Sequence, residues 1–330
     1  MMKKIMLYIL IFLILVFTFF FVGKPSVSEN IVWGVNFSHK HAELLGLDWK
    51  EAYLALIDDM GVGNIKLATY WDLIEREQGN YDFEDLDWQI AMAQEKGVKL
   101  LLTVGMKAPR WPECHFPGWA ENMGKEAQQE RILALIEKII SRYSLSPAIA
   151  MWQVENEPFF PFGQCQWTDK GFLKKEIELV KSLDRLNRPV LVSDSGEGSF
   201  WIQAARFGDV VGTTMYRKVW FHQLETYISY PFPPTFYARK AKIIEKLFSK
   251  EVISVELQAE PWGPKLLYDS PLFEQEKTMN LEQFRKNIEF AKQTGFREFY
   301  LWGAEWWYWM KEKQDQPEIW QEAKGLFGKH

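Results

Sequence analysis

The chain has 330 residues, a formal net charge of −5 and 25% charged side chains. This acidic balance argues against nucleic acid as a partner, because such binding requires a basic surface. Once an apolar N-terminal segment is set aside, about 300 residues remain, which suits one large domain better than two small ones. Aromatic residues make up 16% of the chain and include 16 tryptophans, whose faces pack in cores or against the apolar faces of sugars.

The first segment is an apolar run over residues 5–22 that follows Lys3 and Lys4. At about 1.5 Å per residue in a helix it reaches about 27 Å, close to the thickness of a bilayer core. A cleaved signal peptide has a shorter apolar core and ends in small residues, whereas this run ends in Phe20-Phe21-Val22. The pattern therefore predicts an N-terminal transmembrane helix retained as a signal-anchor, with a cleaved signal peptide as the alternative.

These features divide the chain into three parts. Residues 1–24 are predicted to be the membrane anchor or signal segment, residues 25–30 a polar spacer and residues 31–330 the folded domain. Because a short basic N-terminus stays in the cytoplasm, we expect the domain to be exported and anchored to the cell membrane on its extracytoplasmic side. Cleavage of the segment would instead give a secreted protein.

Eight strand-like apolar runs follow, separated by segments of helical periodicity. The runs cover residues 31–37, 64–68, 99–104, 148–154, 190–192, 210–214, 252–255 and 298–302. Alternating strands and amphipathic helices predict a parallel sheet covered on its outer face. Eight units of about 38 residues predict an α/β fold, the (β/α)8 TIM barrel. A doubly wound sheet that binds a nucleotide would carry a glycine-rich phosphate turn, and the sequence shows none.

The fourth run leads into an acidic turn, Glu155-Asn156-Glu157-Pro158. Carboxylates are rarely buried without a partner, so an apolar strand that ends in this way is not explained by stability alone. Pro158 has no N–H to donate and stops the strand ladder. Asn156 and Glu157 are therefore predicted to lie at the C-terminal lip of a strand, where parallel barrels carry their chemistry.

A second glutamate, Glu256, follows the seventh run. Two carboxyl groups about 5–5.5 Å apart are what a retaining glycosidase needs, one as acid/base and one as nucleophile. Glu260 is the rival for the second position, but it falls in the loop beyond the strand. Glu256 is favoured, because a rigid strand end holds a nucleophile closer to its attack geometry.

Asn156-Glu157-Pro158, Glu256 and Trp302 together resemble the pattern of clan A glycoside hydrolases, which are (β/α)8 barrels. The resemblance implies a retaining β-glycoside hydrolase whose catalytic domain is residues 31–330. It implies that Glu157 is the acid/base, that Glu256 is the nucleophile, and that Asn156 hydrogen-bonds the hydroxyl next to the reacting carbon. It also implies that Trp302, at the end of the eighth run, lies under the reacting sugar.

Further contacts with the substrate are predicted from residues near the strand ends. Tyr216 is a candidate hydrogen-bond donor, and Lys66 or Arg76 is a candidate cation for the nucleophile. Trp262 and Trp111 are candidate sugar platforms, together with Trp306 and Trp307. Residues 71–87 also resemble a clan A segment, in which we interpret Glu75 as a residue that folds the loop.

Cys114 and Cys165 follow consecutive strands, so they either form a disulfide in an exported protein or remain two free thiols. The scattered histidines suggest no metal site, and no cofactor is expected. The predicted partners are a carbohydrate substrate and the membrane. A carbohydrate-binding barrel without catalysis and a transglycosylase that uses the same site are the alternative functions; the sugar and linkage stay open.

Overall fold

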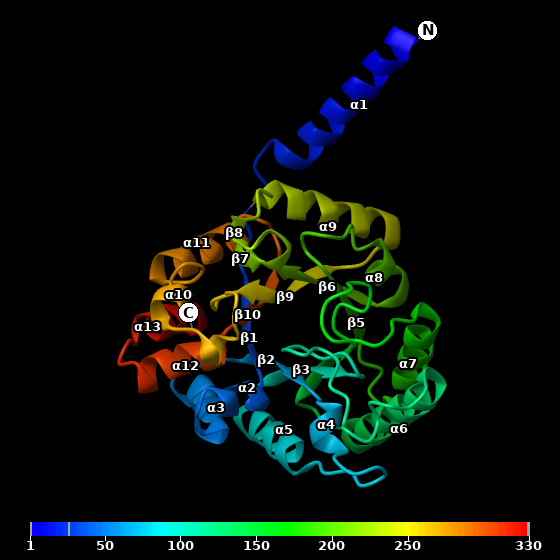
Figure 1. Cartoon of the computed structure of the whole chain (residues 1–330), viewed down its shortest axis with the longest axis vertical. Coiled ribbons are helices and arrows are strands. Elements are labelled where there is room, and N and C mark those ends of the chain that lie inside the picture. Colours follow the sequence, from blue (N-terminus) through cyan, green and yellow to red (C-terminus); the bar gives the residue numbers. More distant parts are fainter. Residues whose placement is uncertain (1, 26, 329–330) are drawn as a thin grey trace.

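The computed structural model describes residues 2–25 and 27–328. Eight parallel strands close into a barrel in the order β1-β10-β9-β6-β5-β4-β3-β2 (Figure 1). The barrel strands are β1 (Val32–Phe37), β2 (Asn64–Ala68), β3 (Lys99–Val104), β4 (Ile149–Val154), β5 (Val190–Asp194), β6 (Val210–Met215), β9 (Val252–Gln258) and β10 (Glu298–Trp302). Each corresponds to one of the eight predicted runs, so the predicted barrel is confirmed.

Helices cover the outside of this barrel (Figure 1). They are α2 (His39–Leu44), α3 (Trp49–Asp58), α4 (Trp71–Ile74), α5 (Glu84–Lys96), α6 (Lys125–Tyr143), α7 (Lys170–Leu183), α8 (Ile202–Phe207), α9 (Pro234–Phe248), α10 (Leu272–Gln275), α11 (Leu281–Lys292), α12 (Ala304–Lys313) and α13 (Glu318–Phe327), with the short 3₁₀ turns η1 (His222–Leu224) and η2 (Leu267–Asp269). Local signals set their ends: the Asp48 carboxylate accepts hydrogen bonds from the backbone N–H groups of Lys50 and Glu51 at the start of α3.

Two apolar layers hold the barrel together. Inside it, Leu101, Leu191, Ile253, Val255 and Tyr300 form a buried cluster, which makes the interior a packed core and not a channel. Between the strands and the helices, a larger core takes the apolar faces of helices such as α6. Burial of both faces explains why the strands read as continuous apolar runs.

An antiparallel hairpin was not predicted. It consists of β7 (Lys218–Phe221) and β8 (Thr226–Ser229) and lies between β6 and α9 in the chain. Its strands mix polar and aromatic residues without a clear alternation, so no periodic pattern predicts them.

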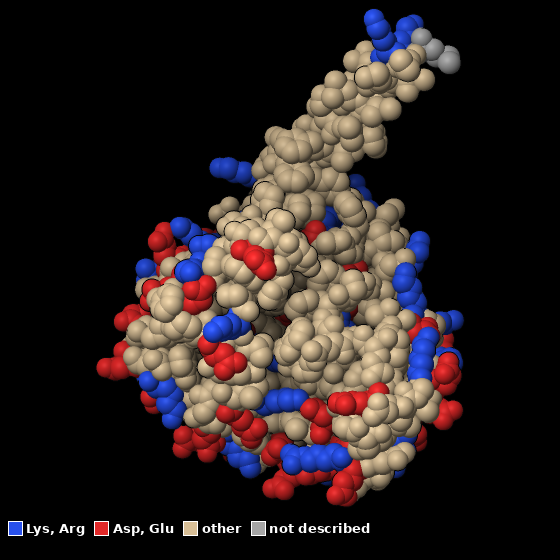
Figure 2. All heavy atoms as spheres, in the orientation of Figure 1, with Lys and Arg blue, Asp and Glu red and all other residues tan. Residues whose placement is uncertain are grey.

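The N-terminal helix α1 (Met2–Phe21) projects from the barrel (Figure 1). It is long and apolar enough to cross a membrane, and none of its residues is buried. Figure 2 shows an uncharged surface along most of its length. At its C-terminal end, Phe20 and Phe21 pack against Phe236 of α9, with ring centroids 5.8 Å apart in both pairs.

Candidate active site

The two predicted catalytic glutamates come together at the C-terminal end of the barrel. Thr214 of β6 lies opposite Glu256 of β9 in the strand register, and its hydroxyl donates a hydrogen bond to Glu157 Oε1 at 3.1 Å. Glu157 lies in the turn just after β4 and is 7% exposed, whereas Glu256 lies within β9 and is 3% exposed. The fold thus places two buried carboxyl groups on either side of one threonine.

The backbone of Glu157 is fixed on both sides of its side chain. Its N–H donates to the Ser193 hydroxyl at 2.9 Å, and its carbonyl accepts from Lys107 Nζ at 3.0 Å. Burial raises the pKa of the Glu157 carboxyl well above its usual value, and the negative charge of Glu256 raises it further. Glu157 therefore holds a proton under conditions in which an exposed glutamate has lost it.

Glu256 has charged and polar partners on both oxygens. Lys66 Nζ lies 3.2 Å from Oε1, and the Tyr216 hydroxyl donates to Oε2 at 3.0 Å. Both partners were predicted, and the structure selects Lys66 over Arg76, which is exposed and lines a different hollow. The ammonium group of Lys66 and the phenol of Tyr216 thus fix the position of both carboxylate oxygens. The two glutamates thus have different surroundings, as acid/base chemistry requires.

Asn156 is buried between two side chains of the site. Its Oδ1 accepts from Gln153 Nε2 at 3.1 Å, and its Nδ2 donates to Glu113 Oε2 at 3.1 Å. The orientation of its amide is therefore fixed by the protein.

Glu113 is a third buried carboxyl group, and the sequence analysis missed it. Burial raises its pKa to about 8, with Glu256 adding to the rise and Lys107 opposing it. Its φ of 72° lies in the left-handed region, which is rare for residues other than glycine and clusters at functional sites. The signal available was a glutamate next to a cysteine in the loop after β3, but that loop's path depends on distant contacts.

A disulfide joins Cys114 to Cys165, with Cα atoms 5.2 Å apart. Of the two alternatives for these cysteines, the structure thus shows the bridge. It ties the loop after β3 to the loop after β4, which carry Glu113 and Glu157. The bridge consequently reduces the freedom of both loops at the mouth of the barrel.

Three of the predicted aromatic residues form a row that leads outward from Glu256. The ring of Tyr216 lies 5.1 Å from that of Trp262, which lies 5.7 Å from Phe162. Phe162, which was not predicted, lies 6.1 Å from Trp111, and Trp111 is 46% exposed. The rings thus pack against one another from the buried Glu256 to the exposed Trp111.

Trp306 and Trp307 are not part of this row, and their proposed contact with sugar is wrong. Both are buried in the core, and their indole N–H groups donate to Gln275 Oε1 and to the Ala259 carbonyl. They lie on α12, whose inner face packs against the barrel, and the sequence did not distinguish that face from an open one.

Trp302 and Glu260 share one partner, Arg110. The Arg110 guanidinium lies 4.1 Å from the centre of the Trp302 ring, and it forms ion pairs with Glu260 and with Glu305. Glu260, the rival nucleophile, is thus engaged by a cation, and one face of the Trp302 ring carries a guanidinium.

Glu75 folds its own loop, in agreement with the interpretation of residues 71–87. Its carboxylate accepts from the Trp71 indole and the Gly79 N–H, both at 2.8 Å, and pairs with Arg131.

A closed parallel barrel with two buried glutamates at the C-terminal ends of its fourth and seventh strands is the arrangement that the resemblance to clan A glycoside hydrolases implies. Sequence comparison agrees. The glycoside hydrolase 42 family model, described as beta-galactosidase, matches residues 48–188. That match includes Glu157 and ends before Glu256.

Curated relatives carry the same kind of description. Beta-galactosidase Bga of Halorubrum lacusprofundi is 27% identical over 47% of this chain and 24% of its own length. A probable mannan endo-1,4-beta-mannosidase F of Aspergillus oryzae is 28% identical over 45% of this chain and 36% of its own. The match with the first relative thus spans only about a quarter of that protein.

Solved structures share the fold. The beta-galactosidase of H. lacusprofundi aligns over 82% of this chain and 52% of its own with a TM-score of 0.54 and 15% identity. GH5_18 from Bifidobacterium longum aligns over 83% of this chain and 70% of its own, with a TM-score of 0.58 and 13% identity. Together these matches place the chain among the clan A glycoside hydrolases, and they extend over more than one family of that clan.

Proposed function

We propose that the chain is a retaining β-glycoside hydrolase that cleaves an oligo- or polysaccharide outside the cytoplasm. The observation that carries the proposal is the pair of glutamates on either side of Thr214. Glu157 is buried beside a neutral hydroxyl and keeps its proton, whereas Glu256 faces the ammonium group of Lys66. This is the division of roles that a double displacement needs.

In the first step, a carboxylate oxygen of Glu256 attacks the anomeric carbon of the bound sugar. The bond from that carbon to the leaving oxygen breaks, and the Glu157 proton moves to the leaving oxygen. The product of this step is a glycosyl ester on Glu256. Lys66 and Tyr216 hold the attacking group in place through its two oxygens.

In the second step, water attacks the same carbon and Glu157, now ionised, takes a proton from it. The ester bond to Glu256 breaks, and both carboxyl groups return to their starting states. Two inversions give net retention of configuration. Asn156, held by Gln153 and Glu113, is placed to bind the hydroxyl next to the reacting carbon throughout.

Two observations indicate which class of substrate to test first. The relatives are named beta-galactosidases and mannan endo-1,4-beta-mannosidases, so β-linked neutral sugars are the class to test first. The row from Tyr216 to Trp111 supplies flat surfaces for more than one sugar ring.

The proposed location rests on α1 and on the disulfide. An apolar helix of 20 residues is long enough to cross a bilayer, and disulfides persist chiefly in oxidising compartments. Protease added to intact spheroplasts should digest the barrel if it lies outside, whereas digestion only after lysis would contradict export.

The decisive experiment measures hydrolysis of aryl β-galactosides, β-mannosides and β-glucosides by the full chain. Glu157→Gln and Glu256→Gln should each lower turnover at least about 10³-fold, because each removes one partner of a coupled reaction. Glu225→Gln, which changes an exposed glutamate of the β7–β8 hairpin, should retain full activity. Full activity in Glu256→Gln with a large loss in Glu260→Gln would move the nucleophile to the rival position.

Stereochemistry provides a second test. NMR of the first-formed sugar should show the β-anomer, as double displacement requires. An initial α-anomer would show single displacement and would contradict the retaining mechanism.

A further inference from the structure

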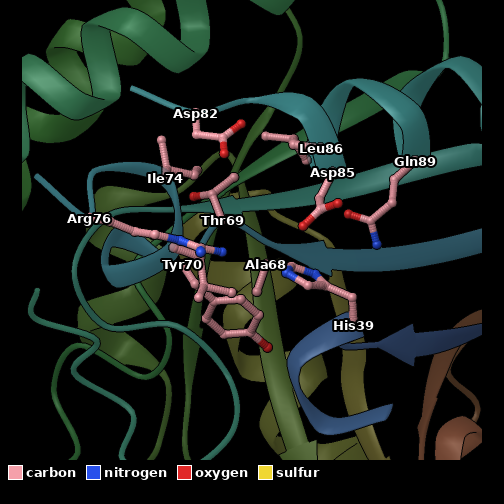
Figure 3. A pocket seen from close by; sticks show the side chains of 11 residues that line it. His39, Ala68, Thr69, Tyr70, Ile74, Arg76, Asp82, Asp85, Leu86 and Gln89 are labelled. Carbon is pink, nitrogen blue, oxygen red and sulfur yellow. The ribbon is translucent and has the colours of Figure 1, made fainter. Parts of the chain in front are cut away.

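Gln89 and Glu176 are two buried side chains with polar atoms that lack a hydrogen-bond partner among the described residues. Gln89 reaches a hollow between the end of β2 and α5 (Figure 3). This hollow has room for about one or two water molecules, which can supply the partners of one amide. Glu176 does not line it, and its neighbour is another carboxyl group, that of Glu155. The Glu155–Glu176 pair is therefore the feature that needs a chemical explanation.

Glu176 lies on the inner face of α7. The other buried residues of this helix are Phe172, Leu173, Ile177 and Val180, so the helical pattern places an apolar residue where Glu176 stands. The Glu176 side chain is 1% exposed. An ionised carboxylate is strongly disfavoured in such surroundings, whereas the neutral acid is tolerated if its proton has an acceptor.

Glu155 supplies an acceptor, because both of its oxygens face N–H donors. Its Oε1 accepts from the backbone N–H of Met106 at 2.8 Å, and its Oε2 accepts from that of Lys107 at 2.5 Å. These donors follow Gly105, whose φ of 117° favours glycine and where a Cβ would overlap the Glu155 carboxylate. Successive N–H groups that point at one carboxylate form an anion-binding concavity. The surroundings of Glu155 thus match an ionised carboxylate.

The contact between the two carboxyl groups requires one proton, since two buried carboxylates in contact cannot both be ionised. Both Glu155 oxygens already accept from N–H groups, so the proton belongs to Glu176. Burial and the charge of Glu155 raise the pKa of Glu176 well above its usual value. Burial raises the pKa of Glu155 as well, but the Glu176 donor and the two N–H groups oppose that rise. The charged groups nearest the pair are Lys107 and Asp169.

Glu155 also connects the two loops that carry the proposed acid/base. The Lys107 carbonyl accepts from the Asn156 N–H at 2.7 Å, and Lys107 Nζ donates to the Glu157 carbonyl at 3.0 Å. Glu155 and Glu157 have φ values of 58° and 44°, which L residues rarely adopt without support from their neighbours. The Glu155 carboxylate thus holds Lys107, and Lys107 holds the turn from which Glu157 extends.

We propose that Glu155 is a positioning residue for the acid/base Glu157, and that Glu176 keeps Glu155 ionised by carrying the one proton of the pair. This inference rests on the proposed glycoside hydrolase function. Glu155 acts through Lys107 and the turn after β4, so the step that depends on it is the transfer of the Glu157 proton to the leaving oxygen.

The test compares two leaving groups in the full chain with Glu155→Gln. The amide of this variant turns an NH₂ group toward one of the two backbone N–H groups, which displaces the turn. The value of kcat/KM for a phenyl β-glycoside, whose leaving group needs a proton, should fall at least about 10²-fold. The value for the 2,4-dinitrophenyl β-glycoside of the same sugar, whose leaving group departs without a proton, should change less than about 5-fold.

Glu176→Gln is the matched conservative variant, because its amide donates to Glu155 as the neutral acid does. It should change kcat/KM for either substrate less than about 5-fold. Glu178→Gln, on the exposed face of the same helix, should retain full activity. An infrared difference spectrum between the wild type and Glu176→Gln should show the loss of one protonated carboxyl band, whatever the activity.

Three results would overturn the inference: equal losses for both leaving groups in Glu155→Gln, a loss in Glu176→Gln as large as in Glu155→Gln, or no change in the protonated carboxyl band. If Glu155→Gln does not fold, Gly105→Ala addresses the same contact, since its Cβ displaces the Glu155 carboxylate, and it should show the same dependence on the leaving group. Failure of the wild type to hydrolyse any glycoside would refute the proposed function separately, because the infrared measurement does not depend on turnover.

Discussion

Two groups among the buried glutamates of this barrel differ in their partners. Glu157 receives a hydrogen bond from the neutral Thr214 hydroxyl and feels the charge of Glu256. Glu260 and Glu305 instead share Arg110, whose guanidinium pairs with both. Burial of a carboxylate is thus common to both groups, and it is the partner that separates a group able to exchange a proton from one locked in an ion pair.

The largest effect is expected from removing Glu157, the proposed acid/base. Glu157→Ala should slow hydrolysis of substrates with poor leaving groups at least about 10³-fold, because no acid remains to protonate the leaving oxygen. Added azide should restore turnover of an activated aryl glycoside and give a glycosyl azide of retained configuration. Glycosyl azide of inverted configuration from this variant would assign the nucleophile role to Glu157 instead.

The next largest effect is a loss of stability when Arg110, the partner of Glu260 and Glu305, is replaced. Arg110→Met should destabilise the protein by about 3–5 kcal/mol, because it leaves Glu260 and Glu305 buried without their cation. Denaturant unfolding measures this directly. Arg110→Met with Glu260→Gln and Glu305→Gln should recover part of the loss, and failure to recover would show that packing on Trp302 dominates.

Removal of the Cys114–Cys165 disulfide tests whether the loops after β3 and β4, which carry Glu113 and Glu157, depend on it. Cys114 and Cys165 are separated by 51 positions, and closing such a loop stabilises a fold by about 4 kcal/mol in the chain-entropy account. Cys114→Ser with Cys165→Ser should lower the denaturation midpoint accordingly. Activity of the remaining folded fraction should fall as well, since Glu113 adjoins the bridge, and unchanged activity would show that the bridge serves stability alone.

The last effect concerns Glu113 and is spread over a range of pH. Its pKa rises from 4.5 to about 8 on folding, so above pH 4.5 the folded state keeps a proton that the unfolded state loses. Stability should therefore decline as pH rises from about 4.5 to 8, by at most about 1.4 kcal/mol per pH unit. Glu113→Gln should remove this slope and be the more stable form at pH 8. Parallel stability curves for variant and wild type would contradict the raised pKa.

The sequence predicted the barrel and the position of the glutamate pair because both depend on local signals. Strand periodicity marks β4 and β9, and Glu157 and Glu256 are fixed by their distance from those strands. Glu113 and Arg110 escaped prediction, because both lie in one loop whose path is set by a disulfide and by contacts with distant segments.

Trp306 is an error of the other kind, because the sequence analysis assigned it to the site and the structure places it in the core. A tryptophan after a barrel strand is equally compatible with a cleft and with a core, and only the packing of α12 decides between them. Gln89 is similar, since nothing in the pattern of α5 shows that its amide lacks partners. Local sequence patterns thus do not predict the contacts between residues that are far apart in the chain.

The contact between α1 and α9 limits how far the barrel can lie from a membrane that contains α1. Phe20 and Phe21 hold the end of the helix against the Phe236 ring, and the link from residues 22 to 31 extends at most about 35 Å. With α1 in a bilayer, the barrel would stay near the bilayer surface and rotate together with the helix. Glycans fixed near the cell surface would then meet its mouth far more often than polymers diffusing in the medium.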